Sequence, residues 1–201
     1  MHLRLITAPT DPILTTAEAK AHLRIYHGDE DGYIDAIVAG VTANIDGAEG
    51  WMGRCWESQQ WELTIDRFPK NNEYGLVAID VPLPPLISVD EILYDDGDGV
   101  EQELAVASVR VIGEGSTGGA YILPIVDAEW PETQDEPASV RIKFTAGYAN
   151  GTPESVKWAV RLMVSHFFEH REAAVDTGAK FGLLELPFGV VTLLMPHRYW
   201  H

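Results

Sequence analysis

Apolar residues recur at helical spacing between Pro153 and about Glu172, where Pro153 occupies a favoured first helical position. The apolar positions form two stripes and a remainder: Val156, Val160, Met163 and Phe167 in one stripe, Ala159, Leu162 and His166 in the second, and Trp158, Val164 and Phe168 outside both. One stripe is enough for a core within the subunit, so we predict that a second stripe packs against a neighbouring subunit. The residues expected on that side of the helix are Trp158, Arg161, Leu162 and Ser165.

Two helices are predicted in the first 55 residues. Thr15 reads as an N-cap and Glu18, three residues later, as its capping-box partner, in a short helix that ends near Leu23. A longer amphipathic helix is predicted over 29–52. It carries apolar residues at spacings of three and four, namely Ile34, Ile37, Val38, Val41, Ile45 and Ala48.

From Trp56 onwards the apolar period changes to two, which is typical of half-buried strands. Alternating runs end at Ile65 and at Val81. Further strands are predicted over 89–94, 106–112, 121–125 and 140–144. Turns rich in Asp and Gly separate these runs, a pattern that favours an antiparallel meander or a small barrel. A mobile loop over 173–182 and a last short helix over 187–195 are expected near the end of the chain.

The predicted fold class is therefore α+β: a small helical bundle of about four helices, interrupted by an inserted antiparallel β domain. Residues 1–55 and 150–201 would form the discontinuous helical core, and residues 56–149 the inserted domain. With 201 residues, of which 46% are hydrophobic, the chain can bury a core without disulfides.

Composition limits the compartment and the partners. The single cysteine, Cys55, excludes an intramolecular disulfide, and Met1-His2-Leu3-Arg4 is followed by no apolar signal segment or spanning helix. We therefore expect a cytoplasmic protein with no membrane partner. The 31 acidic and 14 basic residues give a formal net charge of −17, which argues against DNA binding because that affinity comes mainly from Lys and Arg on phosphates.

One sequence motif suggests metal chemistry. His166-Phe167-Phe168-Glu169-His170 matches H-x-x-E-H, in which two imidazoles one helical turn apart bind zinc in inverted zinc peptidases. Catalysis would also need a third ligand and an open cleft, and the two phenylalanines resemble packing residues. A metal-dependent hydrolase using His166, Glu169 and His170 therefore stays an alternative, beside the simpler interpretation that His166 is partly buried and His170 pairs with nearby carboxylates.

Two further patterns have simpler readings. Gly113 to Gly118 fits G-x-G-x-x-G, but the residues after it read as a strand, whereas a dinucleotide site needs a helix there, so we expect a hairpin loop. Asp95 to Asp98 lacks the spacing of an EF-hand and suits a solvated turn. No G-x-S-x-G elbow occurs. The sequence thus predicts no catalytic, cofactor or metal site.

A series of motifs along almost the whole chain resembles the head-tail connector (adaptor) proteins of long-tailed bacteriophages and of phage-derived gene transfer agents. The branch with a β domain inserted in the helical core is the most similar. The motifs are, in order, Leu14-Thr15, Ala19-Lys20, His22-Leu23-Arg24, Gly53-Arg54, Gln60-Trp61-Glu62-Leu63, Phe68-Pro69, Pro85-Leu86-Ile87-Ser88-Val89, Ile92-Leu93-Tyr94, Trp130-Pro131, Phe144-Thr145-Ala146-Gly147-Tyr148, Pro153, His166-Phe167-Phe168-Glu169-His170-Arg171-Glu172 and Leu193-Leu194-Met195-Pro196-His197-Arg198. His170 departs from the pattern, in which a small polar residue is expected.

The resemblance implies a structural protein without chemistry of its own. Such a protein would form a ring of about twelve copies below the portal protein, close the DNA-filled head, and offer a platform to downstream neck and tail-completion proteins. DNA would pass through its channel without specific binding. The protein would be assembled in the bacterial cytoplasm into a virion or gene transfer agent particle, at the head-tail junction. From another class, a monomeric structural domain with a protein-binding β module stays open.

The C-terminal segment is the second candidate interaction site. Chain ends are usually polar, yet this one carries Arg198, Tyr199 and Trp200, the residue types that most often anchor interfaces. Pro196 is expected to stop the preceding helix and direct the tail away in extended form. We therefore predict that Pro196, Arg198, Tyr199 and Trp200 dock on the portal or on a neighbouring subunit. The alternative is that Tyr199 and Trp200 fold back onto their own subunit.

Overall fold

The computed structural model describes residues 1–70, 77–170 and 188–199. Its larger sheet has five antiparallel strands, and its smaller sheet has three. The larger sheet has the order β1 (His2–Thr7), β2 (Gln59–Ile65), β8 (Val140–Ala146), β4 (Leu86–Asp95) and β5 (Glu101–Glu103). The smaller sheet has the order β3 (Ile79–Val81), β7 (Ala120–Pro124) and β6 (Val109–Ile112), and β6 follows the short η1 (Val106–Ser108).

The inward-facing residues of both sheets share one core. Leu63, Ile92 and Ile142 from the larger sheet and Ile122 from the smaller are fully buried in it. Along β8 the burial alternates strictly from Val140 to Ala146, as expected of a strand with one face in a core and one outside. The two sheets therefore form a single β unit.

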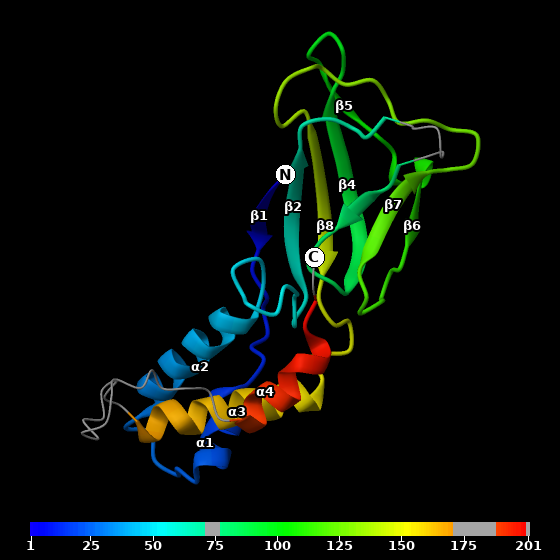
Figure 1. The fold of residues 1–201 in the computed structure, drawn as a ribbon. Coiled ribbons are helices and arrows are strands. Elements are labelled where there is room, and N and C mark those ends of the chain that lie inside the picture. The colour runs from blue at the N-terminus through cyan, green and yellow to red at the C-terminus, as the bar shows by residue number, and fades with distance from the viewer. Residues whose placement is uncertain (71–76, 171–187, 200–201) are drawn as a thin grey trace, which may run out of the picture.

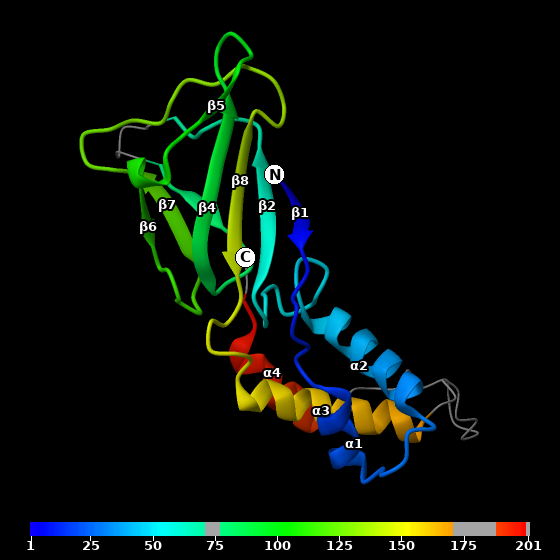
Figure 2. The ribbon, with the colours of Figure 1, turned by 180° about the vertical axis from the view of Figure 1, so that it is seen from behind.

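Four helices lie together at one end of the β unit, as Figures 1 and 2 show from opposite sides. They are α1 (Thr16–Leu23), α2 (Asp31–Ile45), α3 (Glu154–Glu169) and α4 (Phe188–Leu194), which η2 (Met195–His197) extends. Their second core is built around the stripe Ile34, Val38, Val41 and Ile45 of α2 and the stripe Val156, Val160, Met163 and Val164 of α3. The α+β class of the sequence prediction is confirmed.

The first helix begins as its sequence indicates. The backbone N–H of Glu18 donates to the Thr15 hydroxyl over 3.2 Å, and the backbone N–H of Thr15 donates to the Glu18 carboxylate over 2.9 Å. This reciprocal pair is a capping box, and it satisfies amide groups that the helix itself leaves free. The predicted start at Thr15 and the predicted end near Leu23 are both confirmed.

Several sequence expectations are corrected. The larger sheet is not a meander, because β2 pairs with β8 and β8 with β4, and no closed barrel forms among the described strands. Strand β1 was not predicted: it lies in the sheet, although residues 1–55 were assigned to the helical core. The other boundaries of the two units stay a prediction. The short β5 was also missed, since all three of its residues are exposed.

Two helix ends also differ from expectation. Helix α2 stops at Ile45 and not near residue 52, because the chain turns at Gly47, whose φ is +70°. Pro153 caps α3 from outside and is not its first residue, and the helix ends at Glu169. The expected loop over 173–182 and Pro187 lie outside the described residues. Within the described residues, no helix has both the length and the hydropathy that crossing a bilayer requires.

The buried Cys55 leads to a first prediction. Its side chain is fully inaccessible, and burial raises the pKa of the thiol well above its ordinary value. A maleimide or disulfide reagent at pH 8 should therefore leave the native protein unmodified and label one thiol per chain in denaturant. A Ser165→Cys variant, in which the new thiol is partly exposed, is the positive control. Rapid labelling of the folded wild-type protein would contradict the burial of Cys55.

Candidate functional site

The helical and β units meet at a pair of stacked rings. Trp56 lies parallel to Tyr148, with ring centroids 5.8 Å apart and an interplanar angle of 7°. The indole N–H of Trp56 donates to the Ile45 carbonyl over 2.9 Å, and its backbone N–H donates to the Asp46 carboxylate over 2.8 Å. Burial raises the pKa of Asp46, and the N–H groups that it accepts oppose that rise. Both ends of the stack are thus fixed by hydrogen bonds.

Arg54 ties three segments to this stack. Its side chain is buried, with the residue only 3% exposed, and its guanidinium lies 5.6 Å from the centroid of the Trp56 ring. One terminal nitrogen donates to the Tyr148 hydroxyl over 2.9 Å, and the other to the Thr117 carbonyl over 3.1 Å. The loop between β6 and β7 is thereby held against the helical unit. No role was predicted for Arg54 from the sequence. The one feature that could have indicated a role is its position as a single basic residue between Met52-Gly53 and Cys55-Trp56.

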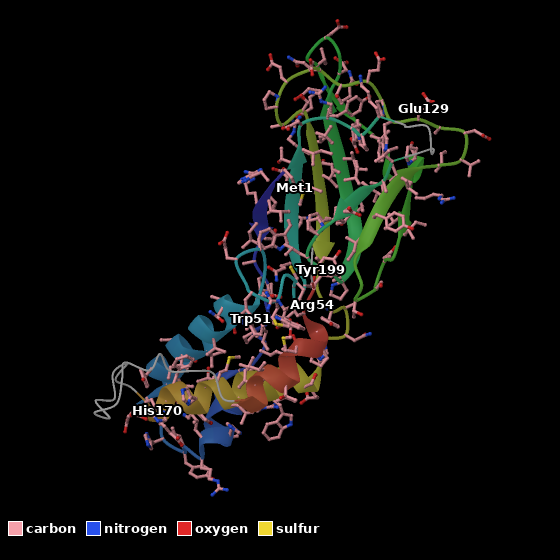
Figure 3. All side chains as sticks on the ribbon, in the orientation of Figure 1. Met1, Trp51, Arg54, Glu129, His170 and Tyr199 are labelled. Carbon is pink, nitrogen blue, oxygen red and sulfur yellow. The ribbon has the colours of Figure 1, made fainter. Side chains whose placement is uncertain are left out.

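The C-terminal segment returns to the same junction, where Figure 3 shows Trp51, Arg54 and Tyr199 close together. The backbone N–H of Tyr199 donates to the Met52 carbonyl over 3.0 Å, and the Arg198 guanidinium lies 5.3 Å from the Trp51 ring centroid. A side chain at Gly119 would meet the Tyr199 hydroxyl at 2.6 Å, so this close approach depends on glycine. Tyr199 therefore bridges the helical unit and the smaller sheet.

His197 strengthens this return of the chain. Its Nε2 lies 2.8 Å from the Ser155 hydroxyl, and its ring meets Trp56 edge-on with centroids 5.9 Å apart. Burial, together with the nearby Arg54 charge, lowers the pKa of His197. The imidazole is consequently neutral at physiological pH and packs as an aromatic ring.

This geometry corrects the expected course of the tail. Pro196 lies within η2 and does not direct the chain outward, and Tyr199 folds back onto its own subunit. Trp200 lies outside the described residues. A docking role for Pro196, Arg198, Tyr199 and Trp200 on a portal or neighbour stays a prediction.

The outer face of α3 carries a large exposed ring. Trp158 is 49% exposed, although α1 flanks it: the His22 ring meets it edge-on at 5.7 Å, and the Arg161 guanidinium lies 5.5 Å from its centroid. Burial, and secondarily the Arg161 charge, lowers the pKa of His22, so this contact is with a neutral ring at neutral pH. Arg161 also pairs with Glu18 and Glu154 at 3.7 and 3.5 Å. Trp158 thus stands on a surface that its own chain holds rigid.

The four residues predicted to face a neighbour are not equally available. Ser165 is partly exposed, but Leu162 packs against the helical core, and its Cδ1 lies 3.8 Å from the position of a Cβ on Gly189 of α4. Much of the second apolar stripe is therefore covered by α4 within the same chain. Two aromatic residues of α3 stay exposed: Trp158, which lies outside both stripes, and Phe167 of the first stripe, which is 40% exposed near the end of the helix.

The two imidazoles of the H-x-x-E-H motif lie close together, with ring centroids 4.8 Å apart, but only His166 is part of α3. His170 lies beyond the last residue of α3, with φ −111° and ψ 71°, and its Nδ1 is 2.9 Å from the His166 carbonyl. His166 Nε2 is buried and has no hydrogen-bond partner in the described part of the chain. No group of three or more His, Cys, Asp or Glu side chains suited to a metal occurs among residues 1–70, 77–170 and 188–199.

The other two motifs behave as turns. The loop over 113–119 joins the antiparallel strands β6 and β7, so no helix follows it and the hairpin expectation is confirmed. In the Asp95 to Asp98 turn, the Asp96 carboxylate accepts the backbone N–H groups of Asp98 and Val100, each over 3.0 Å. These bonds lower the pKa of Asp96, the one from Val100 most.

The outer face of the larger sheet is covered by ion pairs between neighbouring strands. Across the strands, Arg4 pairs with Glu62 at 2.7 Å, Lys143 pairs with Glu91, and Arg141 pairs with Asp95 at 2.9 Å and with Glu101 at 2.8 Å. The hydrogen bond from Arg141 holds the pKa of Asp95 below its ordinary range. Each basic side chain on this part of the sheet is thus bound to a carboxylate.

Comparison with known proteins gives structural neighbours only. No protein-family model and no curated protein sequence matches the chain. Among solved structures, the chain is similar to one in the neck of an empty gene transfer agent particle computed with C6 symmetry, with 24% identity and a TM-score of 0.74. It is also similar to a chain in the virion of a native gene transfer agent particle (22%, TM-score 0.69) and to one in the neck of a native particle computed with C12 symmetry (22%, TM-score 0.67).

Each of these alignments covers 100% of this chain and 97% of the other chain. The likeness therefore extends over both the helical and the β units, and it shows a common fold. It includes the elements that the motif series of the sequence analysis spans.

The packing of Tyr199 at the junction of the two units leads to a second prediction. Replacing Tyr199 by Ala removes the ring that joins the helical unit to the β6–β7 loop, and should destabilise the protein by about 2 kcal/mol, a loss of roughly 5 °C in melting temperature. Met195→Ala is the matched control, because Met195 is 44% exposed in the same segment. Thermal unfolding followed by circular dichroism checks both. Equal melting temperatures for Tyr199→Ala and wild type would show that the tail does not contribute to the fold.

Proposed function

We propose that this protein is a structural component of the neck of a phage-like particle, and specifically a head-tail connector. The proposal places a homo-oligomeric ring of about twelve copies below the portal protein. The ring closes the DNA-filled head and provides the platform on which downstream neck and tail-completion proteins assemble. Its location is the head-tail junction of a virion or gene transfer agent particle, assembled in the bacterial cytoplasm.

The observation that carries the proposal is the full-length likeness to neck chains of gene transfer agent particles, whose reconstructions have C6 and C12 symmetry. Two properties of this chain support it independently. The motif series of a connector runs through both units, and the exposed Trp158 stands on a rigid helical surface, as an interface anchor does. An enzymatic alternative built on His166, Glu169 and His170 has less support: the two imidazoles are neighbours, but no group of three or more metal-binding side chains occurs among the described residues.

The ring depends on the outer face of α3, where Trp158 is the residue to change. Trp158→Asp places a charge at the centre of the proposed contact but leaves the buried stripe of α3 intact, so the monomer should fold with a melting temperature within a few degrees of wild type. Leu162→Asp is a poorer choice, because Leu162 packs against its own helical core. In cells producing particles, we expect Trp158→Asp to yield DNA-filled heads without tails.

Glu169→Gln, at an exposed position near the end of the same helix, is the control that should assemble normally. Electron microscopy of the particles measures the outcome. Normal tailed particles containing Trp158→Asp would contradict the proposed interface, and particles that never contain the wild-type protein would contradict the neck assignment. A protein that stays monomeric and outside particles would support the monomeric binding-domain alternative instead.

The acidic surface is expected to let duplex DNA pass through the ring without binding. A net charge of −17 repels phosphates, and the basic residues Arg4, Arg141 and Lys143 on the sheet face are already bound to carboxylates. This arrangement leaves few cations to replace the counterions of DNA.

Gel-shift titration with duplex DNA at low salt tests this expectation, since cationic sites bind most strongly there. Wild-type protein should give no shift at micromolar concentration. The variant Glu62→Gln/Glu91→Gln, which releases Arg4 and Lys143 from their partners, should bind more than wild type does. A salt-dependent shift with wild-type protein would be evidence against passage without binding.

A further inference from the structure

The helical unit has a groove on a different surface from Trp158. It has a volume of about 510 Å³ and lies between the segment that precedes α1 and the helix α2. Its walls are mostly apolar, formed by Pro12, Leu14, Val38, Ala39, Thr42 and Ala43, with Thr16 and Asp35 at its edge. Nothing in the described part of the chain fills this groove, although it adjoins the helical core through Val38 and Leu14.

We propose that this groove receives Trp158 of a second copy of the chain. The proposal rests on the ring of the proposed function and names the surface that accepts the exposed tryptophan. Helix α1 separates the two surfaces: its start binds α2 through the Thr16 hydroxyl and Asp35, 2.6 Å apart, and its end meets Trp158 through His22. The tryptophan of one copy therefore reaches the groove of the next copy and not its own.

Charge complementarity identifies the second copy as the occupant. Asp35 at the groove edge forms no ion pair within the described residues, and the same is true of Lys157, which precedes Trp158 on α3. Docking the indole brings this cation towards that carboxylate, in a chain where basic residues are outnumbered 31 to 14.

Such a contact is heterologous, since each copy offers one tryptophan and one groove on separate surfaces. Heterologous contacts continue from copy to copy until a rotation closes them into a ring. A face-to-face contact of two identical surfaces would instead stop at a dimer. In the proposed interface, one copy contributes Trp158 and the next copy contributes the groove that receives it.

Photo-crosslinking tests the pairing directly. p-Benzoylphenylalanine is placed at position 158, and a mixture of isotope-labelled and unlabelled copies is irradiated, both at millimolar concentration in solution and in assembled particles. We expect mixed-isotope crosslinks from position 158 to residues 35–43 of α2. Crosslinks that join position 158 to another surface of the second copy would overturn the groove assignment while leaving the ring intact. Absence of any intermolecular crosslink in both samples would overturn the ring as well.

Complementation provides the second measurement. Trp158→Ala removes the inserted ring, and Ala39→Trp fills the groove, so neither variant should assemble alone. When the two variants are mixed, Ala39→Trp supplies an intact Trp158 and Trp158→Ala supplies an intact groove. Sedimentation should therefore show one-to-one dimers and no larger ring. Phe167→Ala and Ala36→Trp, exposed positions on the same two helices outside the groove, are matched controls that should assemble as wild type. Failure of the mixed variants to pair would contradict the proposal.

The charge pair has its own test. Lys157→Glu and Asp35→Lys should each weaken assembly at low salt, and the double exchange should restore most of it, because the pair is re-formed with opposite polarity. Assembly of the double variant no better than that of the single variants would show that these two residues do not meet.

Discussion

The stack of Trp56 on Tyr148 is the contact on which the arrangement of the protein depends. Trp56 follows the turns after α2 and precedes β2, and Tyr148 lies between β8 and α3, so two of the three passages of the chain between the helical and β units meet at this pair; the third joins β1 to α1. Arg54 adds the β6–β7 loop, and Tyr199 closes the junction from the C-terminal side. Aromatic pairs of this kind contribute about 1 kcal/mol beyond their buried area, and here that contribution is combined with hydrogen bonds at each ring. The junction therefore fixes the angle between the units.

A fixed angle between the units would matter for the ring that we propose. In a cyclic assembly a small change of orientation is repeated at every copy, so a flexible junction would prevent closure or give rings of different sizes. Arg54 has no ion pair among the described residues, so its burial costs free energy, which its bonds to Tyr148 and Thr117 offset in part. We interpret this cost as follows. An apolar residue at position 54 would pack, but it would not hold the three segments in one relative orientation, whereas the hydrogen bonds of Arg54 do.

The sequence predicted the parts of this fold that depend on local chemistry. The capping box at Thr15 and Glu18, the stripes of α2 and α3, and the alternation along β8 are all set by residues within a few positions. Strand order was not predictable, because β2 pairs with β8 although β3 to β7 lie between them in the sequence. Strand β1 has five exposed residues of six, and its alternation is limited to Leu3 and Leu5, so its membership of the sheet follows from its pairing with β2.

The candidate site was predicted in the same partial way. Helical spacing correctly indicated more apolar surface on α3 than one core contact needs, but spacing could not show that α4 covers Leu162. Composition marked Tyr199 as an anchor, since aromatic residues at a chain end are unusual, yet the partner of that anchor proved to be its own subunit. The groove beside α2 had no signal at all, because its walls come from two segments that the fold brings together.

Electrostatic repulsion sets a limit on how such copies can associate. Each copy carries a net charge of −17, and at physiological ionic strength charges are screened only beyond about 8 Å, so adjacent copies repel wherever their acidic surfaces face. In the ring that we propose, association would come from surfaces where apolar area is buried and the local charges are opposite, and the proposed surfaces are Trp158 with Lys157 and the groove with Asp35. One such contact is small and therefore weak. Closure of the proposed ring, or capture on a template that aligns the copies, makes many weak contacts act together. Free copies would then remain apart until the site of assembly is available.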